Sequence, residues 1–182
     1  MNFLNTNFSD KLFAGETEEY KVKNLYNNFT FSNDCEKITY NSDDFFNYNY
    51  VDLKFSESGE TFLLADCKIN LEPFRIASKL TSYNGKKNLT TDNCVVVNKN
   101  HLEHYRKNNI PTFLIFNIDN RNKHNGIYFI NVKDLNKNNC YPFTTNSGIE
   151  KINIPCDFNP NNKVSSYEEL FEKINSYRKI LS

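Results

Sequence analysis

The sequence has no tryptophan, one methionine, five glycines and five prolines among 182 residues. No apolar run approaches the roughly 20 residues of a membrane-spanning helix, and the opening stretch MNFLNTNFSD lacks the basic start and apolar core of a signal peptide. We therefore expect a soluble cytoplasmic protein. The patterns G-x-x-x-x-G-K-S/T and G-x-G-x-x-G are missing too, so the use of a nucleoside triphosphate or a dinucleotide is unsupported.

Neither sign of charge is in excess. Lys and Arg number 22, as do Asp and Glu, which argues against a protein that binds nucleic acid through a global positive charge. A surface for a polyanion would have to be a local patch. The length and the 15% aromatic content suit one domain with a real core, and we expect a single domain over residues 1–182.

The cysteines do not follow a metal or disulfide pattern. There are five, widely spaced, with no C-x-x-C pair for zinc or redox chemistry. We expect reduced thiols, and an iron-sulfur cluster is unsupported.

The segment from about Phe8 to Phe29 predicts an amphipathic helix, because a stripe recurs at alternating steps of three and four. Its members are Leu12, Gly15, Glu19, Val22, Tyr26 and Phe29. Further strands are predicted at CVVVNK, PTFLIFNID and GIYFINVKDL, and a short helix at NKNHLEHYRKNN. The C-terminal SSYEELFEKINSYRKIL predicts a helix that begins with a Ser-x-x-Glu capping box. This order favours an α/β fold, a three-layer α/β/α sandwich with a central mixed sheet.

The stretch TFLLADCKIN, residues 61–70, reads as a buried strand except for Asp66 and Lys68. Strand side chains alternate between faces, so these two residues are expected to share a face with Phe62 and Leu64. Charges in such a strand need a structural or chemical reason.

Asp52 lies in a preceding strand-like run that is joined to this strand by the turn-rich SESGE. If residues 56–60 form the loop, Phe55 pairs with Thr61 and Asp52 faces Leu64, one diagonal step from Asp66. An odd loop keeps Asp52 on the face of Asp66 and Lys68, whereas an even loop turns it away.

The order of helix Glu, strand Asp and then Asp-x-Lys resembles the PD-(D/E)xK, or restriction endonuclease-like, nuclease superfamily. The resemblance is carried by GETEE with Glu19, YVDLKF with Asp52, and LLADCKI with Asp66 and Lys68; 13 residues separate the two aspartates. The segments HLEHYRKNNIPTFLIFNID and GIYFINVKDL are similar to the closing elements of Holliday-junction resolvase-like or Mrr-like members. The chain departs from the pattern in having Val51 where the naming proline would stand, and Asp66 in place of the commoner Glu.

This resemblance implies a metal-dependent endonuclease that hydrolyses phosphodiester bonds of DNA, with Mg²⁺ or Mn²⁺ as cofactor. Glu19, Asp52 and Asp66 would be metal ligands together with the main-chain carbonyl of Cys67, because these ions prefer oxygen donors. Lys68 would orient or deprotonate the attacking water and offset charge on the phosphate. Double-stranded DNA is the expected partner, and cutting two strands favours a homodimer.

Other accounts of the same residues stay open. Asp66 and Lys68 can form a structural ion pair at the end of a strand, Asp52 can be an ordinary strand-edge charge, and Glu19 can reach solvent from the edge of its stripe. At the level of function, the alternatives are an RNA-cleaving nuclease of the same fold, or a non-catalytic module that binds nucleic acid or protein.

Weaker candidates lie outside this constellation. His101 and His104 are three residues apart on the predicted short helix, but no Cys or His partner lies at zinc-ligand spacing, so a solvated helix face is favoured. Two sets of residues are candidates for contacts with a phosphate backbone, with burial or surface solubility as the alternative. They are Tyr105, Arg106 and Lys107 on the helix, and Lys86, Lys87 and the RNK stretch at 121–123 in loops.

Overall fold

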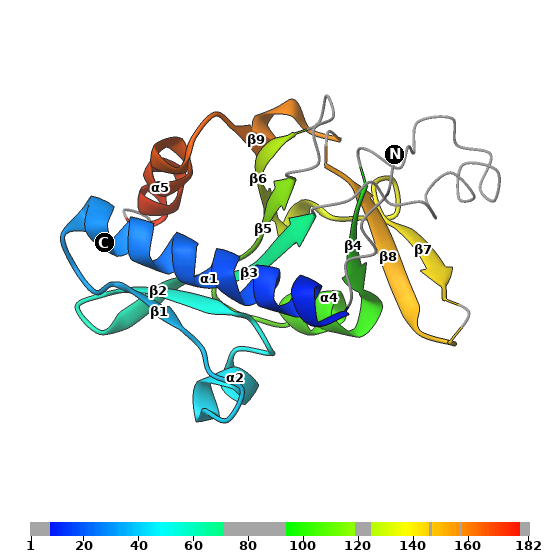
Figure 1. Ribbon diagram of the computed structural model, residues 1–182, viewed down its shortest axis with the longest axis horizontal. Helices are drawn as coiled ribbons and strands as arrows, with labels where there is room; N and C mark the ends of the chain where they lie inside the picture. Colours follow the sequence, from blue (N-terminus) through cyan, green and yellow to red (C-terminus); the bar gives the residue numbers. More distant parts are fainter. Residues whose placement is uncertain (1–7, 71–93, 119–124, 146, 157, 179–182) are drawn as a thin grey trace.

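The computed structural model describes residues 8–70, 94–118, 125–145, 147–156 and 158–178. Its side chains are described from residue 16 onward, apart from those of Phe45, Asn70 and Cys94. The fold is mixed α/β and is built around one mixed six-stranded sheet (Figure 1). Within these ranges no helix has the length and apolar character needed to cross a membrane.

Sheet A holds strands in the order β1-β2-β3-β5-β6-β9. β3 and β5 run parallel, and the other neighbours are antiparallel. The bounds are β1 Cys35–Lys37, β2 Leu53–Glu57, β3 Glu60–Asn70, β5 Thr112–Ile118, β6 Gly126–Asn131 and β9 Lys163–Val164. The long central strand β3 therefore has a neighbour on each side, which explains the near-continuous apolar run of its sequence.

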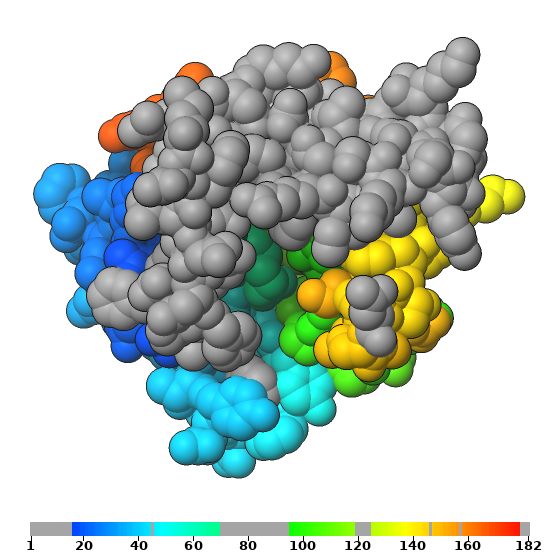
Figure 2. Space-filling model, turned by 45° about the vertical axis from the view of Figure 1, so that its right-hand side comes forward, coloured from blue at the N-terminus to red at the C-terminus, as the bar shows by residue number. Residues whose placement is uncertain are grey.

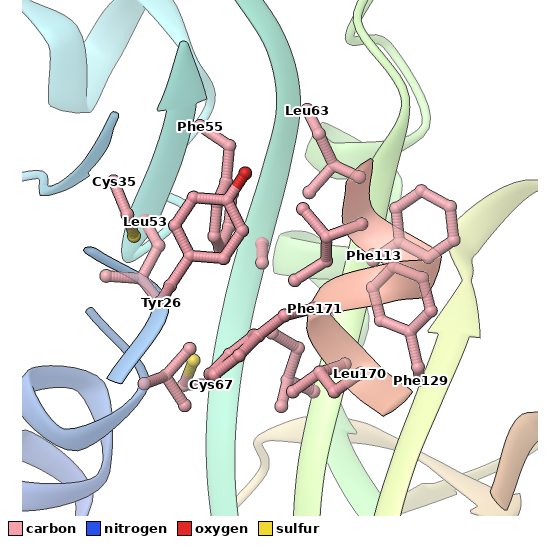
Figure 3. Close-up of a cluster of buried hydrophobic side chains, with 14 of the residues drawn as sticks. Tyr26, Cys35, Leu53, Phe55, Leu63, Cys67, Phe113, Phe129, Leu170 and Phe171 are labelled. Atoms are coloured by element: carbon pink, nitrogen blue, oxygen red, sulfur yellow. The ribbon is translucent and has the colours of Figure 1, made fainter. Parts of the chain in front are cut away.

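Two helices cover one face of sheet A. α1 (Phe8–Thr30) confirms the predicted helix and buries Val22 and Tyr26 of its stripe. α5 (Tyr167–Ser176) begins at Ser166, whose side chain accepts a hydrogen bond from the Glu169 amide at 3.2 Å, so the capping-box prediction is confirmed. The core between these helices and the sheet is aromatic: the Tyr26 ring meets Phe55 edge-on at 4.8 Å (Figure 3).

The predicted α/β/α sandwich would place helices on the opposite face of sheet A, but the structure covers this face in another way. A three-stranded sheet B in the order β4-β8-β7 packs there together with the short helix α4 (Lys99–Tyr105), in place of a layer made of helices alone. The strands are β4 Cys94–Asn98, β7 Tyr141–Thr144 and β8 Glu150–Pro155. Leu64 and Leu114 of sheet A meet Val97 of β4 and Leu102 of α4 in this second core.

Smaller elements connect these layers. They are α2 (Asp43–Asn47) and the 3-10 turns η1 (Val132–Asp134) and η2 (Pro160–Asn162). Cys35, Cys67, Cys140 and Cys156 are free thiols, as expected for reduced cysteines. Lys86 and Lys87, the basic residues at 121–123 and the last residues of the predicted C-terminal helix lie outside the described residues.

Candidate functional site

The β2–β3 hairpin brings Asp52 and Asp66 to the same face of sheet A by a route that the sequence did not predict. The turn is Ser58–Gly59, an even loop, and Phe55 pairs with Leu63 instead of Thr61. An even loop alone would turn Asp52 to the other face.

A β-bulge restores the arrangement. Between the pairs Phe55–Leu63 and Ser56–Thr61, β3 contains one extra residue, Phe62. Phe62 consequently packs in the core under α1 and α5, so the expectation that it shares a face with Asp66 was wrong. The bulge returns the ladder to the register in which Leu53 pairs with Ala65, and continuing that register places Asp52 opposite Asp66.

Three of the predicted site residues come together at this point. The Lys68 Nζ donates to Asp66 Oδ1 at 2.5 Å and lies 3.7 Å from Asp52 Oδ2. The same Asp52 oxygen accepts from the Cys67 amide at 2.8 Å, and the Cys67 carbonyl accepts from Lys68 Nζ at 3.3 Å. The Cys67 thiol points into the opposite core, as its position in the strand predicts (Figure 3).

The two aspartates lie in a poorly solvated position. Asp66 is 1% exposed, and its Oδ2 is buried with no hydrogen-bond partner among the described residues. Burial and the adjacent Asp66 charge raise the pKa of Asp52 well above its ordinary value, although Lys68 and the Cys67 amide oppose the shift. Two carboxylates with one shared ammonium thus leave an excess of negative charge, which a cation would relieve.

Lys68 is held in its charged form. Burial alone would lower its pKa, but the carboxylates of Asp66 and Asp52 outweigh burial and raise it above its ordinary value. At neutral pH the side chain is therefore an ammonium that can neutralise charge and orient an oxygen.

Glu19 lies at the border of this cluster. Its Oε2 pairs with Lys37 Nζ of β1 at 2.7 Å, and none of the described contacts joins it directly to Asp66 or Lys68. Burial and the charge of Asp52 raise the pKa of Glu19, so the two carboxylates do interact through space. Glu19 is thus half-buried on the core side of α1 and does not extend freely into solvent.

Within the described ranges, no three His, Cys, Asp or Glu side chains lie together in a position to hold a metal ion. The donor set that is present nevertheless suits Mg²⁺ or Mn²⁺. Mg²⁺ is commonly bound by only one or two protein carboxylates, with water and substrate oxygens completing its shell. Asp52, the unpaired Oδ2 of Asp66 and the Cys67 carbonyl supply such oxygens.

Several residues in or next to α4 that were weaker candidates for phosphate or zinc contacts are engaged in contacts within the protein. Tyr105 is 2% exposed, so its ring is not presented to a phosphate backbone. Arg106 is exposed, and its guanidinium donates one hydrogen bond to the Leu135 carbonyl at 2.9 Å. His101 and His104 stack on the Tyr50 ring, with centroids 6.3 and 5.2 Å apart, in place of the solvated face that was favoured.

Sequence reasoning missed two features beside the cluster. Glu18 of α1 is 4% exposed, and its Oε1 accepts hydrogen bonds from the Tyr167 hydroxyl and, at 3.1 Å, from Asn117 Nδ2. Its neighbour Glu19 fitted the helical stripe, so periodicity gave no signal for Glu18. Tyr50 has a φ of +71°, which no sequence pattern indicated.

Figure 2 shows a hollow in the molecular surface in which atoms with the teal colour of β3 are visible. Cyan atoms of the region before β2 and green and orange atoms of α4 and β8 lie next to them.

Comparison with known proteins identifies a similar fold. No protein-family model matches the sequence. No curated protein sequence matches it either. Among solved structures, the chain is similar to D212, a nuclease from a fusselovirus, with a TM-score of 0.55 over 100% of both chains and 10% sequence identity. At this identity the similarity establishes the fold alone.

Proposed function

We propose that the protein is a metal-dependent nuclease of the PD-(D/E)xK superfamily, with a restriction endonuclease-like fold in one domain. The observation that carries the proposal is the meeting of Asp52, Asp66 and Lys68 on one face of a β-hairpin, with a buried Asp66 oxygen that has no hydrogen-bond partner in the described part of the chain. The similarity to a viral nuclease supports it at the level of fold.

Asp52, Asp66 and the Cys67 carbonyl would hold Mg²⁺ or Mn²⁺, with Glu19 contributing through water. Bound there, the ion would supply charge neutralisation for the phosphate and lower the pKa of a water nucleophile.

The residues of the chain itself have separable roles in this proposal. The Asp52 carboxylate is fixed by the Cys67 amide, so it is positioned before any ligand arrives. The Lys68 ammonium would face the scissile phosphate and orient the attacking water, because its raised pKa favours a role as a cation. Lys37 holds Glu19 in place beside Asp52.

We propose that the substrate is double-stranded DNA. We also propose that the protein acts as a homodimer, so that both strands are cut. The balanced charge of the sequence is compatible with a local contact surface around Asp52, Asp66 and Lys68. An RNA substrate is the nearest variant, and the assay below distinguishes it.

The test is nicking of supercoiled plasmid in Mn²⁺ or Mg²⁺, with and without chelator. Asp66→Asn and Lys68→Ala should reduce the rate by at least about 100-fold, since each removes a group that acts on the reacting phosphate. Asp134→Asn and Lys133→Ala, which change exposed residues of η1, are the matched controls and should cut at the wild-type rate.

A parallel assay with labelled single-stranded RNA of the same sequence assigns the substrate. If the protein cuts the RNA in a metal-dependent way and leaves the plasmid intact, RNA would replace DNA as the proposed substrate. Binding of nucleic acid without cutting in any metal would overturn the nuclease and leave a binding module of the same fold.

A further inference from the structure

A cavity of about 330 Å³ lies where α4 begins and β8 starts, in the layer that covers the face of sheet A carrying Leu64 and Asp66. It is lined by Asn98, Asn100, His101, Gly148, Ile149 and Glu150. Its size is at the lower end of the range of small-molecule sites, about 300–1,000 Å³, and suits a single planar group and not a double helix.

The lining has the chemistry of a site for a nucleobase. Asn98 stands at the N-cap position of α4, and its side-chain amide makes no capping hydrogen bond within the described residues. Asn98 and Asn100 are exposed and carry both donors and acceptors, while Ile149, 49% exposed, supplies an apolar contact. Glu150 is paired with Lys99 at 3.0 Å, so its charge would not repel a polyanion strongly.

His101 lines this cavity, and its ring centroid lies 6.1 Å from that of Tyr105, a residue of the core that also contains Leu64 of β3. Leu64 shares its face of sheet A with Asp66, so the cavity and the proposed catalytic centre lie on the same side of the sheet. The His101 ring is nearly parallel to that of Tyr50, at an interplanar angle of 16°.

The segment that presents Tyr50 is strained and tightly held. Asn49 and Tyr50 have φ values of +58° and +71°, which cost energy for residues with side chains. Asn108 holds this segment by accepting from Asn49 Nδ2 and donating to the Tyr48 carbonyl at 3.2 Å. This segment supports the ring of His101, which lines the cavity, because the Tyr50 ring stacks on it.

We propose that this cavity binds one unpaired base of the DNA substrate, next to the phosphate that is cut. The amides of Asn98 and Asn100 and the imidazole of His101 would bond to the edge of the base. The inference rests on the proposed nuclease function and adds a substrate preference to it. A base in a duplex reaches such a cavity only after leaving the stack, so DNA with an unpaired nucleotide binds more tightly than DNA that is fully paired.

Binding is measured without metal, by fluorescence anisotropy in chelator, so that failure of catalysis does not affect the result. The probes are a labelled duplex with one central unpaired adenine, the same duplex fully paired, and the same duplex with an abasic site in place of that adenine. The wild type should bind the unpaired-base duplex roughly 10-fold more tightly than either of the others, the gain of one good base contact.

The double variant N98A/N100A should lose that 10-fold preference and keep the affinity for paired DNA. His101→Ala should behave in the same way, and Asn138→Ala, an exposed asparagine far along the chain, is the control. The two asparagines are exposed, so their replacement leaves the core intact. Equal affinity for all three duplexes, or an equal loss for paired and unpaired DNA, overturns the proposal. A preference that persists in a protein that cuts nothing overturns the nuclease and leaves the base site standing.

Discussion

The Asp52 carboxylate accepts a 2.8 Å hydrogen bond from the main-chain amide of Cys67, the residue between Asp66 and Lys68. Asp52 immediately precedes β2, so this bond ties the end of one strand to the centre of its neighbour. An acid that is held by the backbone stays beside the second carboxylate even though the two repel each other.

Asp52→Asn should stabilise the protein when chelator is present, because the amide keeps the bond to Cys67 and removes the repulsion from Asp66. Burial and the Asp66 charge raise the pKa of Asp52, so the folded state binds its proton more tightly than the unfolded state does. Ionising Asp52 therefore costs folding stability. This cost is absent below about pH 4, the ordinary carboxyl pKa, and grows as the pH rises toward the folded-state pKa.

Thermal unfolding between pH 4 and pH 8 measures this effect. The variant should melt higher at neutral pH, by about 2–4 °C for each kcal/mol of repulsion relieved, with the difference closing toward pH 4. Mn²⁺ should raise the melting temperature of the wild type and not of the variant. A variant that is less stable across the whole range would contradict this account, and Asp134→Asn serves as the exposed control.

The turn at Ser58–Gly59 predicts opposite effects at its two positions. Both residues have positive φ, +53° and +87°, as the type I′ turn of a two-residue hairpin requires. Ser58→Asn should stabilise the protein by a few tenths of a kcal/mol, because asparagine adopts positive φ readily. Gly59→Ala should destabilise it by about 1 kcal/mol, because alanine is strained at this φ. Among the described residues no atom outside the chain neighbours lies within 4 Å of the added methyl group, so a steric clash does not contribute to this cost.

Urea unfolding of both variants provides the measurement. Gly148, with φ +80° and the same open surroundings, is the matched position, and Gly148→Ala should cost a similar amount. If Gly59→Ala were neutral while Gly148→Ala was costly, the assigned turn would be wrong.

Tyr167→Phe should destabilise the protein by about 1–3 kcal/mol, the cost of leaving a buried acceptor short of a donor. The Tyr167 hydroxyl donates to Glu18, whose only other described hydrogen-bond donor is Asn117. Denaturant unfolding should show the loss in Tyr167→Phe and little change in Tyr20→Phe, because Tyr20 is 51% exposed. Equal effects of the two substitutions would argue against a structural role for the Glu18 contact.

Tyr26 predicts a loss of stability in alkali. Burial raises its pKa from about 10 to about 12, although Arg178 opposes the shift. The folded protein keeps the proton longer, so stability is fully present below pH 10 and declines by up to roughly 3 kcal/mol as the pH rises through 12.

Urea midpoints between pH 8 and pH 12 isolate this contribution. Tyr26→Phe should flatten the decline above pH 10, while lowering stability below it through lost hydrogen bonds to Asn175 and Arg178. Tyr40→Phe, at a residue 76% exposed, should leave the curve unchanged. A parallel decline in wild type and Tyr26→Phe would assign the alkaline transition to other groups.

Much of the fold was predictable because its signals are local. The stripe through Val22 and Tyr26 predicted α1, the Ser166 capping box predicted the start of α5, and the apolar runs predicted β3, β4, β5 and β6. The three-stranded sheet B was not predicted, because β7 is a short, partly exposed strand and the pairing of β8 with β4 and β7 is set by tertiary contacts.

The sequence was enough to predict which residues form the aspartate–lysine cluster, but not how they are arranged. Asp52, Asp66 and Lys68 stood out as charges in apolar strands, and the structure brings them together. The register was wrong by two residues, since neither the two-residue turn nor the bulge at Phe62 has a signature in the alternation of side chains. The contact of Glu19 with Lys37 depends on how α1 lies on β1, which periodicity does not specify.

The bulge at Phe62 also limits how this hairpin can change during evolution. Because Phe62 is the residue that β3 has in excess of β2, a one-residue deletion that removes the bulge would leave Asp52 opposite Asp66, whereas a one-residue insertion without a second bulge would turn one aspartate to the other face. Homologous chains that retain both aspartates should therefore include hairpins that are one residue shorter and lack the bulge.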